Sequence, residues 1–245
     1  MITVKSEKEI DLMREPCKII RDLLLLLEER IQVGMTTKEL DKIAYDYITS
    51  YGAKPSFLGL YGFPATTCIS IDEEVVHSFP SDRVIKENEI VSVDVGAYLN
   101  GFHADAARSF YVGSISPEKK RLIDVTRECF FKGIEGLCVG STIGDIGAAV
   151  QKHAESNGFS VVRDMVGHGV GRKLHEDPSV PNFGKAGTGV RIRKGMTLAI
   201  EPMINMGGYE VVLDGWSCKT KDGLPSAHYE NTVAITDDGV EILTL

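Results

Sequence analysis

The chain has few of the features that mark secreted, membrane-bound or nucleic-acid-coating proteins. Its five cysteines are scattered without a CxxC pair, which argues against a disulfide framework and against a zinc knuckle. The leucine run at 23–27 is far too short for a membrane span, and the charged N-terminus has no signal-peptide core. A formal net charge of −8 argues against non-specific nucleic-acid binding. We therefore expect a cytoplasmic protein with no membrane attachment and no nucleic-acid specificity.

No linker or low-complexity block interrupts the 245 residues, so we expect a single domain over 1–245. A weak internal repeat lies within it. The helical stretch 33–52, bounded by glycines, has a counterpart at 139–158, which is 106 positions later. The segment 86–94, which runs from a basic residue through a strand-like stretch to an acid, recurs at 193–201 with an offset of 107. The two offsets predict two similar halves with pseudo-twofold symmetry.

Local patterns predict the elements of both halves. Thr36 and Thr142 each stand three positions before an acid, which is the spacing of a capping box. Gly52 and Gly158 suit helix C-caps. Strands that arrive in hairpins, with helices grouped between them, favour an α+β fold with a largely antiparallel sheet. The expected helices are 6–31, 36–51, 117–137 and 142–157, and the expected strands are 66–72, 89–98, 102–112, 159–166, 196–201, 208–214 and 229–236.

Two candidate functional residues lie in one predicted hairpin. Asn100–Gly101 is a strong signal for a two-residue turn between strands. Such a turn places Asp94 opposite Ala107. The same register places Asp105 opposite Gly96, so the two aspartates share one face with Cα atoms roughly 7–8 Å apart. A slip of one residue reverses the faces, and the pair alone is equally consistent with a solvated strand.

Two more acids, Glu201 and Glu230, lie at the ends of predicted strands. If all four carboxylates converge, their repulsion is prohibitive unless they are protonated or paired with cations, and two divalent cations cancel the charge. One added imidazole gives an oxygen-rich set that suits Mn, Fe, Co or Zn. His168 is the natural nitrogen ligand of such a set, which leaves His77 and His175 for catalysis.

His168 and His175 lie in the segment 167–178, GHGVGRKLHEDP, which contains too much glycine for a helix. The plain alternative is a tight loop whose histidines are satisfied by the backbone. The glycines do not have GxGxxG spacing and do not lead into a helix, which excludes a dinucleotide loop. No second histidine follows His175 at the spacing of a zinc-protease helix.

A resemblance to a known family rests on motifs that follow one another along nearly the whole chain. They are CISIDEEVVHSFP (68–80), DVGAYLNGFHAD (94–105), GHGVGRKLHEDP (167–178), GMTLAIEPMIN (195–205) and WSCKTKDGLPSAHYENT (216–232). In these motifs the chain resembles the type I methionine aminopeptidases in their short bacterial form. The resemblance implies a pseudo-twofold pita-bread fold, with a curved sheet covered by helices around a two-metal centre, and a monomeric protein.

The resemblance also implies a role for each matching residue. His77 and His175 match the catalytic histidines, with His175 stabilising the oxyanion and His77 contacting the scissile amide. The implied reaction is removal of the N-terminal methionine from nascent chains with a small second residue, by a hydroxide that bridges two divalent metals (Co, Mn, Fe or Zn). The implied partners are nascent chains at the ribosome. Glu201 is the implied proton shuttle. The implied metal ligands are Asp94, Asp105, His168, Glu201 and Glu230.

The same resemblance implies an apolar pocket for the methionine side chain, because a flexible thioether suits aromatic and sulfur contacts. Without the resemblance these residues are better explained as ordinary core. The implied pocket residues are Phe57, Leu60, Phe63, Cys68, Leu174 and Trp216.

The sequence departs from the family pattern at Leu60, Tyr61, Leu174, His228 and Asn231, where the family often has Tyr, His, Phe, Gln and His. All of the implied ligands remain, so the departures bear on pocket shape, rate, metal preference and whether the chain is a primary or secondary paralogue. Two alternatives stay open. One is an Xaa-Pro aminopeptidase or dipeptidase of the same fold, which usually carries an extra N-terminal domain. The other is a non-catalytic binding protein on this fold.

Overall fold

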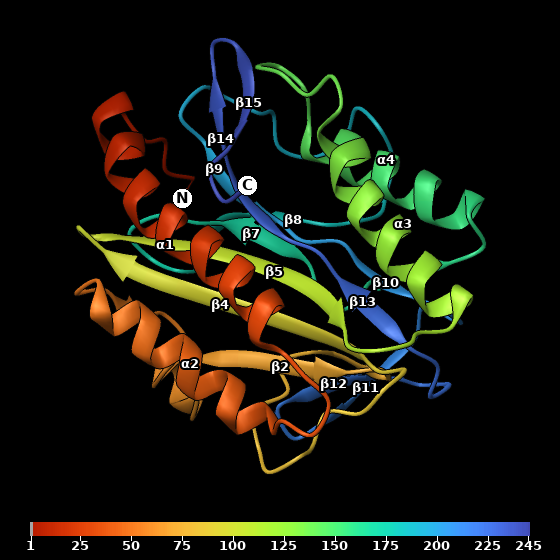
Figure 1. The fold of residues 1–245 in the computed structure, drawn as a ribbon. Coiled ribbons are helices and arrows are strands. Elements are labelled where there is room, and N and C mark those ends of the chain that lie inside the picture. The colour runs from red at the N-terminus through yellow and green to blue at the C-terminus, as the bar shows by residue number, and fades with distance from the viewer. Residues whose placement is uncertain (1) are drawn as a thin grey trace.

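The computed structural model describes residues 2–245, in which helices lie on one side of a layer of strands (Figure 1). The helices agree with those predicted. The helix that begins at Pro117 ends before the predicted residue 137, because Gly136 adopts a left-handed backbone with φ of 73°. The α-helices are α1 (Glu7–Arg30), α2 (Thr37–Ser50), α3 (Pro117–Ile134) and α4 (Ile143–Ser156), and a 3₁₀ turn, η1, covers Leu60–Gly62.

The strand pairs within residues 2–245 are all antiparallel, which confirms the predicted sheet type. The hairpin of β4 and β5 is extended by β2 and β1, and β9 lies between β14 and β7 in a second sheet. The strands are β1 (Lys54–Pro55), β2 (Thr67–Ile71), β3 (Glu74–Val76), β4 (Ile90–Leu99), β5 (Phe102–Tyr111), β6 (Ser160–Val161), β7 (Gly167–Gly169), β8 (Glu176–Val180), β9 (Thr197–Ile200), β10 (Met203–Asn205), β11 (Val211–Asp214), β12 (Ser217–Thr220), β13 (Ser226–His228), β14 (Asn231–Thr236) and β15 (Gly239–Ile242).

The predicted strand 159–166 is wrong over most of its length. Only Ser160–Val161 forms a strand, because its partner β10 is short and the chain bends at 163–164. The predicted strand 208–214 begins late, at Val211. Several short strands were not predicted, among them β7 and β8 in the glycine-rich segment. Short strands carry too little period-two pattern to be recognised locally.

The internal repeat has a counterpart in the hydrogen bonds of the backbone. Gly34 N–H donates to the Ile85 carbonyl at 2.9 Å, and Gly140 N–H donates to the Ile192 carbonyl at 3.0 Å. The donors are offset by 106 positions and the acceptors by 107, as in the sequence repeat. The turn before each of α2 and α4 is therefore tied to the segment before β4 or β9 in the same way.

Both of these helices begin with the predicted capping box. Glu39 accepts a hydrogen bond from the backbone N–H of Thr36 at 2.8 Å, and Asp145 accepts one from Thr142 at 2.7 Å. Gly52 lies one position beyond the C-cap of α2 in the left-handed conformation, with φ of 71°. These local interactions satisfy backbone groups that a helix end otherwise leaves unpaired.

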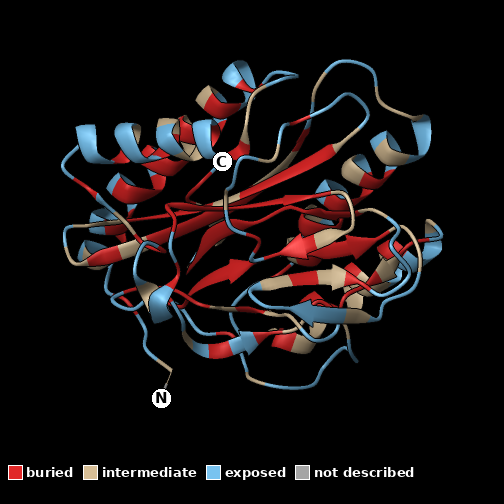
Figure 2. Cartoon of the chain, turned by 90° about the horizontal axis from the view of Figure 1, so that it is seen from below, coloured by how far each residue is buried: buried red, intermediate tan, exposed pale blue. Residues whose placement is uncertain are grey.

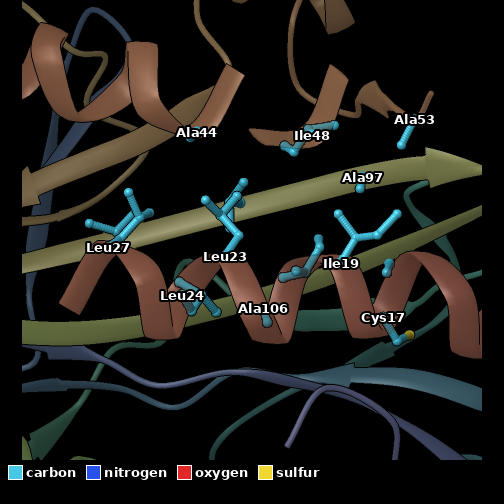
Figure 3. Close-up of a cluster of buried hydrophobic side chains, with 14 of the residues drawn as sticks. Cys17, Ile19, Leu23, Leu24, Leu27, Ala44, Ile48, Ala53, Ala97 and Ala106 are labelled. Carbon is cyan, nitrogen blue, oxygen red and sulfur yellow. The ribbon is translucent and has the colours of Figure 1, made fainter. Parts of the chain in front are cut away.

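The core lies between the helices and the strands. Figure 2 shows buried residues on the faces of the helices that are turned to the strands, and exposed residues on the outer faces. Figure 3 shows Ile19, Leu23 and Leu27 of α1 pointing toward Ala44 and Ile48 of α2, and all of these side chains are buried. No helix within the described residues is long and apolar enough to cross a membrane. The packed helices hold the strands that carry the candidate site.

Candidate metal centre

The hairpin of β4 and β5 has the register predicted from its Asn-Gly turn. Asp94 lies opposite Ala107, and Asp105 lies opposite Gly96. Both turn residues have positive φ, 55° for Asn100 and 86° for Gly101, which the tight turn requires. The side chains of Asp94 and Asp105 are within hydrogen-bonding reach of each other. The local sequence therefore places two carboxylates side by side.

The second pair of acids meets where β9 and β14 run alongside each other. Asn231 pairs with Ile200, so the residues just outside these strands, Glu230 and Glu201, are brought together. The backbone of Glu230 also exchanges hydrogen bonds with Ala107, its N–H donating at 3.0 Å and its carbonyl accepting at 3.4 Å. This pairing joins β14 to the hairpin and brings Glu230 beside Asp94 and Asp105.

His168 lies on β7, not in a loop, and glycines flank it because the neighbouring chain is close. A Cβ on Gly167 would come within 2.4 Å of the Ala199 carbonyl oxygen, and one on Gly169 within 2.4 Å of the Asp177 carbonyl oxygen. His168 Nδ1 lies 2.9 Å from the Gly169 carbonyl oxygen. A proton on Nδ1 fits that contact and leaves the Nε2 lone pair free to bind a metal ion.

These groups share one cavity of about 380 Å³. It is lined by every residue that the sequence analysis proposed for the metal centre, the catalytic histidines and the pocket: Phe57, Leu60, Phe63, Cys68, His77, Asp94, Asp105, His168, Leu174, His175, Glu201, Trp216 and Glu230. The remaining lining residues were not proposed as site residues: Tyr61, Val76, Met165, Val166, Gly167 and Ser179. Val76 and Gly167 adjoin His77 and His168 in the sequence, so proximity to those histidines was an available signal.

The ligand candidates are close enough for a cation. One ligand atom from each of Asp105, His168 and Glu230 lies within 4.8 Å of the other two. His168 Nε2 is 3.7 Å from Asp105 Oδ2 and 3.6 Å from Glu201 Oε1. Asp105 and Glu230 are buried, with 3% and 2% of their surface exposed, so water cannot solvate their charge.

The electrostatics of the cluster are unfavourable for bare carboxylates. Burial raises the pKa of Asp94 to about 7 and the pKa of Glu201 to about 8. Burial and the neighbouring carboxylates raise the pKa of Asp105 and of Glu230 well above the usual range. Burial also lowers the pKa of His168 to about 4, so its imidazole is neutral near pH 7. Four crowded acids and a neutral imidazole form a set that lacks positive charge.

This donor set fits divalent cations. Within residues 2–245, Asp94 Oδ1, Asp105 Oδ1 and Glu230 Oε1 are buried and have no hydrogen-bond partner. Buried polar atoms are normally paired, and unpaired ones indicate a missing ion or a functional role. Carboxylate oxygens with one imidazole are ligands that Mn, Fe, Co and Zn accept.

The other two histidines are more exposed and stand beside the cluster. The rings of His168 and His175 are edge to face, with centroids 4.5 Å apart. His77 has a left-handed backbone with φ of 65°, a strain that surrounding structure must support. Tyr61, one of the departures from the family pattern, also has positive φ, and its ring stacks on His175 with centroids 6.2 Å apart.

Part of the cavity lining is apolar. Phe57, Phe63, Cys68 and Leu174 form one buried cluster, against which Leu60 packs. Trp216 contacts Phe63 edge to face, with centroids 5.4 Å apart. A cavity lined by apolar residues and by acids suits a substrate that carries an apolar side chain next to its charged chain end.

Three side chains that support the acids were not recognised as functional from the sequence. Asn182 Nδ2 donates to the Glu201 carbonyl at 2.9 Å. Arg108 donates to the carbonyl of Glu230 and, at 2.8 Å, to Asn231 Oδ1. His228 Nε2 lies 3.6 Å from Glu201 Oε2. Of these three, His228 had a signal, because it departs from the family pattern near Glu230, and so does Asn231, which accepts the hydrogen bond from Arg108.

Known proteins resemble the chain over its whole length. The profile of metallopeptidase family M24 matches residues 11–237. The methionine aminopeptidase of Clostridium perfringens is 58% identical and covers 100% of this chain and 99% of its own length. A crystal structure of methionine aminopeptidase from Rickettsia prowazekii has a TM-score of 0.98 and 41% identity, and the match covers 100% of both chains. Prolidase from Pyrococcus furiosus has a TM-score of 0.80 at 23% identity, over 99% of this chain and 65% of that chain.

The likeness to prolidase shows a shared fold and nothing more, because the identity is low. The match to the solved methionine aminopeptidase structures confirms the pita-bread fold that the resemblance implied. Identity of this level over the full length, together with the profile match, shows the family as well. The chain belongs to metallopeptidase family M24 and, within it, to the methionine aminopeptidases.

Proposed function

We propose that this chain hydrolyses the peptide bond after an N-terminal methionine when the second residue is small, and that it uses two divalent cations. The observation that carries the proposal is that four acids, His168 and a cluster of apolar side chains line one cavity. The acids are suited to a cationic centre and the apolar cluster to a methionine side chain. Membership of the methionine aminopeptidases supports the same reaction.

The proposed ligands divide between the two cations. Asp105, His168 and Glu230 form the tight trio, and Glu201 adjoins His168. Asp94 lies against Asp105 and completes a second position beside the first. Bound divalent cations supply hydrolysis with a water of lowered pKa and with polarisation of the substrate carbonyl. Mn, Fe, Co and Zn compete for such a site, and their relative affinity and availability decide which metal is bound.

The protein groups then move protons and stabilise charge. The Glu201 carboxylate takes the proton of the attacking water and delivers it to the amide nitrogen as the C–N bond breaks. His175, whose ring is beside that of His168, donates an N–H to the carbonyl oxygen as negative charge develops there. His77 contacts the scissile amide from its fixed, left-handed position.

The apolar part of the lining selects the first side chain. Phe63 and Trp216, in edge-to-face contact, and the Cys68 sulfur present aromatic and soft surfaces to a thioether. Leu60 and Leu174 occupy two positions where the family often has aromatic residues. The pocket of this chain is therefore lined by more aliphatic surface than the usual pattern provides.

The natural substrates follow from this reaction. We expect them to be the N-termini of nascent chains, met in the cytoplasm at the ribosome by a monomeric enzyme. Ribosome association is tested by cosedimentation of the purified protein with translating ribosomes, and the monomeric state by light scattering. Failure to cosediment with translating ribosomes contradicts the first expectation, and a dimeric mass contradicts the second.

The deciding experiment is methionine release by metal-stripped protein that is titrated with Mn, Fe, Co or Zn. The substrates are Met-Ala-Ser and an Xaa-Pro peptide. Metal-dependent release of methionine from the first peptide alone is expected. Cleavage of the Xaa-Pro peptide moves the chain to the proline-specific branch. Metal binding without cleavage of either peptide supports a non-catalytic binding protein instead.

A further inference from the structure

The carboxylate of Glu201 has a histidine near each oxygen. Its Oε1 lies 3.6 Å from His168 Nε2, and its Oε2 lies 3.6 Å from His228 Nε2. His168 lines the cavity, whereas His228 is 1% exposed and is absent from the described cavity lining. His228 therefore contacts Glu201 from the interior of the protein, behind the candidate ligands.

The position of His228 is set by its main chain. The residue pairs with Met203 where β13 runs beside β10. Its N–H donates to Ser109 Oγ at 2.9 Å, and Ser109 Oγ donates to its carbonyl at 3.0 Å. Ser109 belongs to β5, so His228 is held between the two halves of the molecule. Because His228 is also buried, the packing around its imidazole limits the directions in which the ring can point.

The imidazole also has an unused polar atom. Among the described residues, His228 Nε2 is buried and has no hydrogen-bond partner. Leaving such an atom unpaired costs about 1–3 kcal/mol, so a partner is expected. Glu201 Oε2 is a carboxylate oxygen just beyond hydrogen-bond range, and hydrogen bonds in catalytic sites often shorten when a ligand binds. An imidazole with its proton on Nε2 is a donor for that oxygen.

We propose that His228 is a positioning residue of the metal centre, whose Nε2–H donates to Glu201 Oε2 and orients that carboxylate toward the cation. The inference rests on the proposed role of Glu201 as a ligand. Asn182 donates a hydrogen bond to the Glu201 carbonyl at 2.9 Å, and this contact does not orient the carboxylate. The carboxylate therefore needs a separate hydrogen-bond donor. Glutamine, which the family often has at this position, is also an N–H donor. Outer hydrogen bonds of this kind orient ligands and tune metal affinity.

A matched pair of variants separates donation from packing. His228→Met and His228→Gln introduce side chains of similar length, but only Gln keeps an N–H donor. We expect the Met variant to bind Mn²⁺ about 10–100-fold more weakly, in competition with a metal indicator, and the Gln variant to stay close to the parent. His153→Gln is the control, because His153 of α4 pairs with Glu128 of α3 at 2.8 Å and is absent from the described cavity lining. The control is expected to leave the affinity unchanged.

A double-mutant cycle tests whether the effect passes through Glu201. In a Glu201→Gln background, His228→Met is expected to cause little further loss of Mn²⁺ affinity. Equal affinities of the Met and Gln variants, or a full loss in the Glu201→Gln background, overturn the proposal. If the Met variant does not fold, His228→Asn replaces it, because its amide is one carbon shorter than that of Gln and is expected to give the same loss.

The binding readout also keeps this inference separate from the proposed function. Mn²⁺ affinity is measured without substrate, on the full-length chain. A protein that binds Mn²⁺ in the expected order of variants but cleaves no methionine contradicts the proposed function and leaves the role of His228 standing. A protein that releases methionine while all His228 variants bind Mn²⁺ equally supports the proposed function and contradicts the role of His228.

Discussion

Asp94 and Asp105 lie in the middle of ten-residue strands, whereas Glu201 and Glu230 lie just beyond the ends of shorter ones. The first pair is placed by the ladder of one hairpin, whose register follows from its own turn. The second pair is placed by the pairing of β9 with β14, two strands that are far apart in the sequence, and Asn182 adds a side-chain hydrogen bond to the Glu201 carbonyl. The first pair of acids is thus positioned by a local hairpin, and the second pair by pairing between strands that are distant in the sequence.

This difference exists although the backbones of the two halves repeat. The turns before α2 and α4 make equivalent hydrogen bonds, and Asp94 and Glu201 occupy equivalent positions of the repeat. We propose that residues 1–245 form one domain of two related halves. A shared backbone plan therefore constrains where a ligand stands, while the residues that hold it can differ.

The largest expected effect concerns Glu201, the acid for which we propose both a ligand and a proton-transfer role. Glu201→Gln should keep the fold but lower turnover of Met-Ala-Ser by about 10²–10⁴-fold, because the amide cannot take a proton. The unfolding midpoint in urea checks that the fold remains. Asp94→Asn is the matched variant in the first half, and it should weaken metal binding. Parent-like turnover in the Glu201 variant contradicts the assignment of the site.

The next effect separates two histidines of the second half. His175→Ala should lower kcat by about 10²–10³-fold, as expected for loss of a donor to the developing oxyanion. Metal affinity should stay near the parent value, because His168, and not His175, belongs to the compact ligand trio. Steady-state kinetics and a metal titration on the same preparation measure both quantities. Loss of metal with unchanged chemistry after reconstitution shows that the two roles are exchanged.

A third prediction concerns pH and the whole acid cluster. Burial raises the pKa of Asp94 to about 7 and of Glu201 to about 8, whereas carboxyl groups in the unfolded chain have a pKa of about 4. The folded chain therefore retains protons that the unfolded chain has released, and its stability falls as pH rises through this window. Below about pH 6.5 the lowered pKa of His168 and of His228, each about 4, acts in the opposite direction.

The net fall in stability is consequently expected between about pH 6.5 and 8, above the titration of an unfolded histidine. It is measured as the Tm of protein in EDTA. Mn²⁺ should reverse the trend, because cations bind the deprotonated acids. A Tm in EDTA that rises across this window is incompatible with buried acids of raised pKa.

The smallest effect tests the symmetry of the halves directly. Thr36→Ala and Thr142→Ala each remove one capping box, and each should lower the free energy of unfolding by about 1 kcal/mol. Activity should not change, because both caps lie at helix starts outside the described cavity lining. Urea unfolding of both variants provides the comparison. Strongly unequal losses in the free energy of unfolding would show that the two capping boxes stabilise the protein to different extents.

Local patterns carried much of the fold and part of the site. The bounds of α1, α2 and α4, the capping boxes and the register of the β4–β5 hairpin depend on residues a few positions apart, and each agrees with the structure. The strand predicted at 159–166 fails for the opposite reason, because its pairing depends on β10, more than a few positions away. The roles of the site residues came from motif resemblance, and these roles stay predictions.

The sequence by itself determined the helices, the hairpin that places Asp94 beside Asp105, and the supply of acids and histidines for a metal centre. Only the tertiary structure decided that Glu230 pairs with Ala107 and that His228 stands behind Glu201. The reason is physical. Turns and caps are settled by neighbouring residues, whereas these contacts join segments that become neighbours only when the helices and sheets pack around a common core.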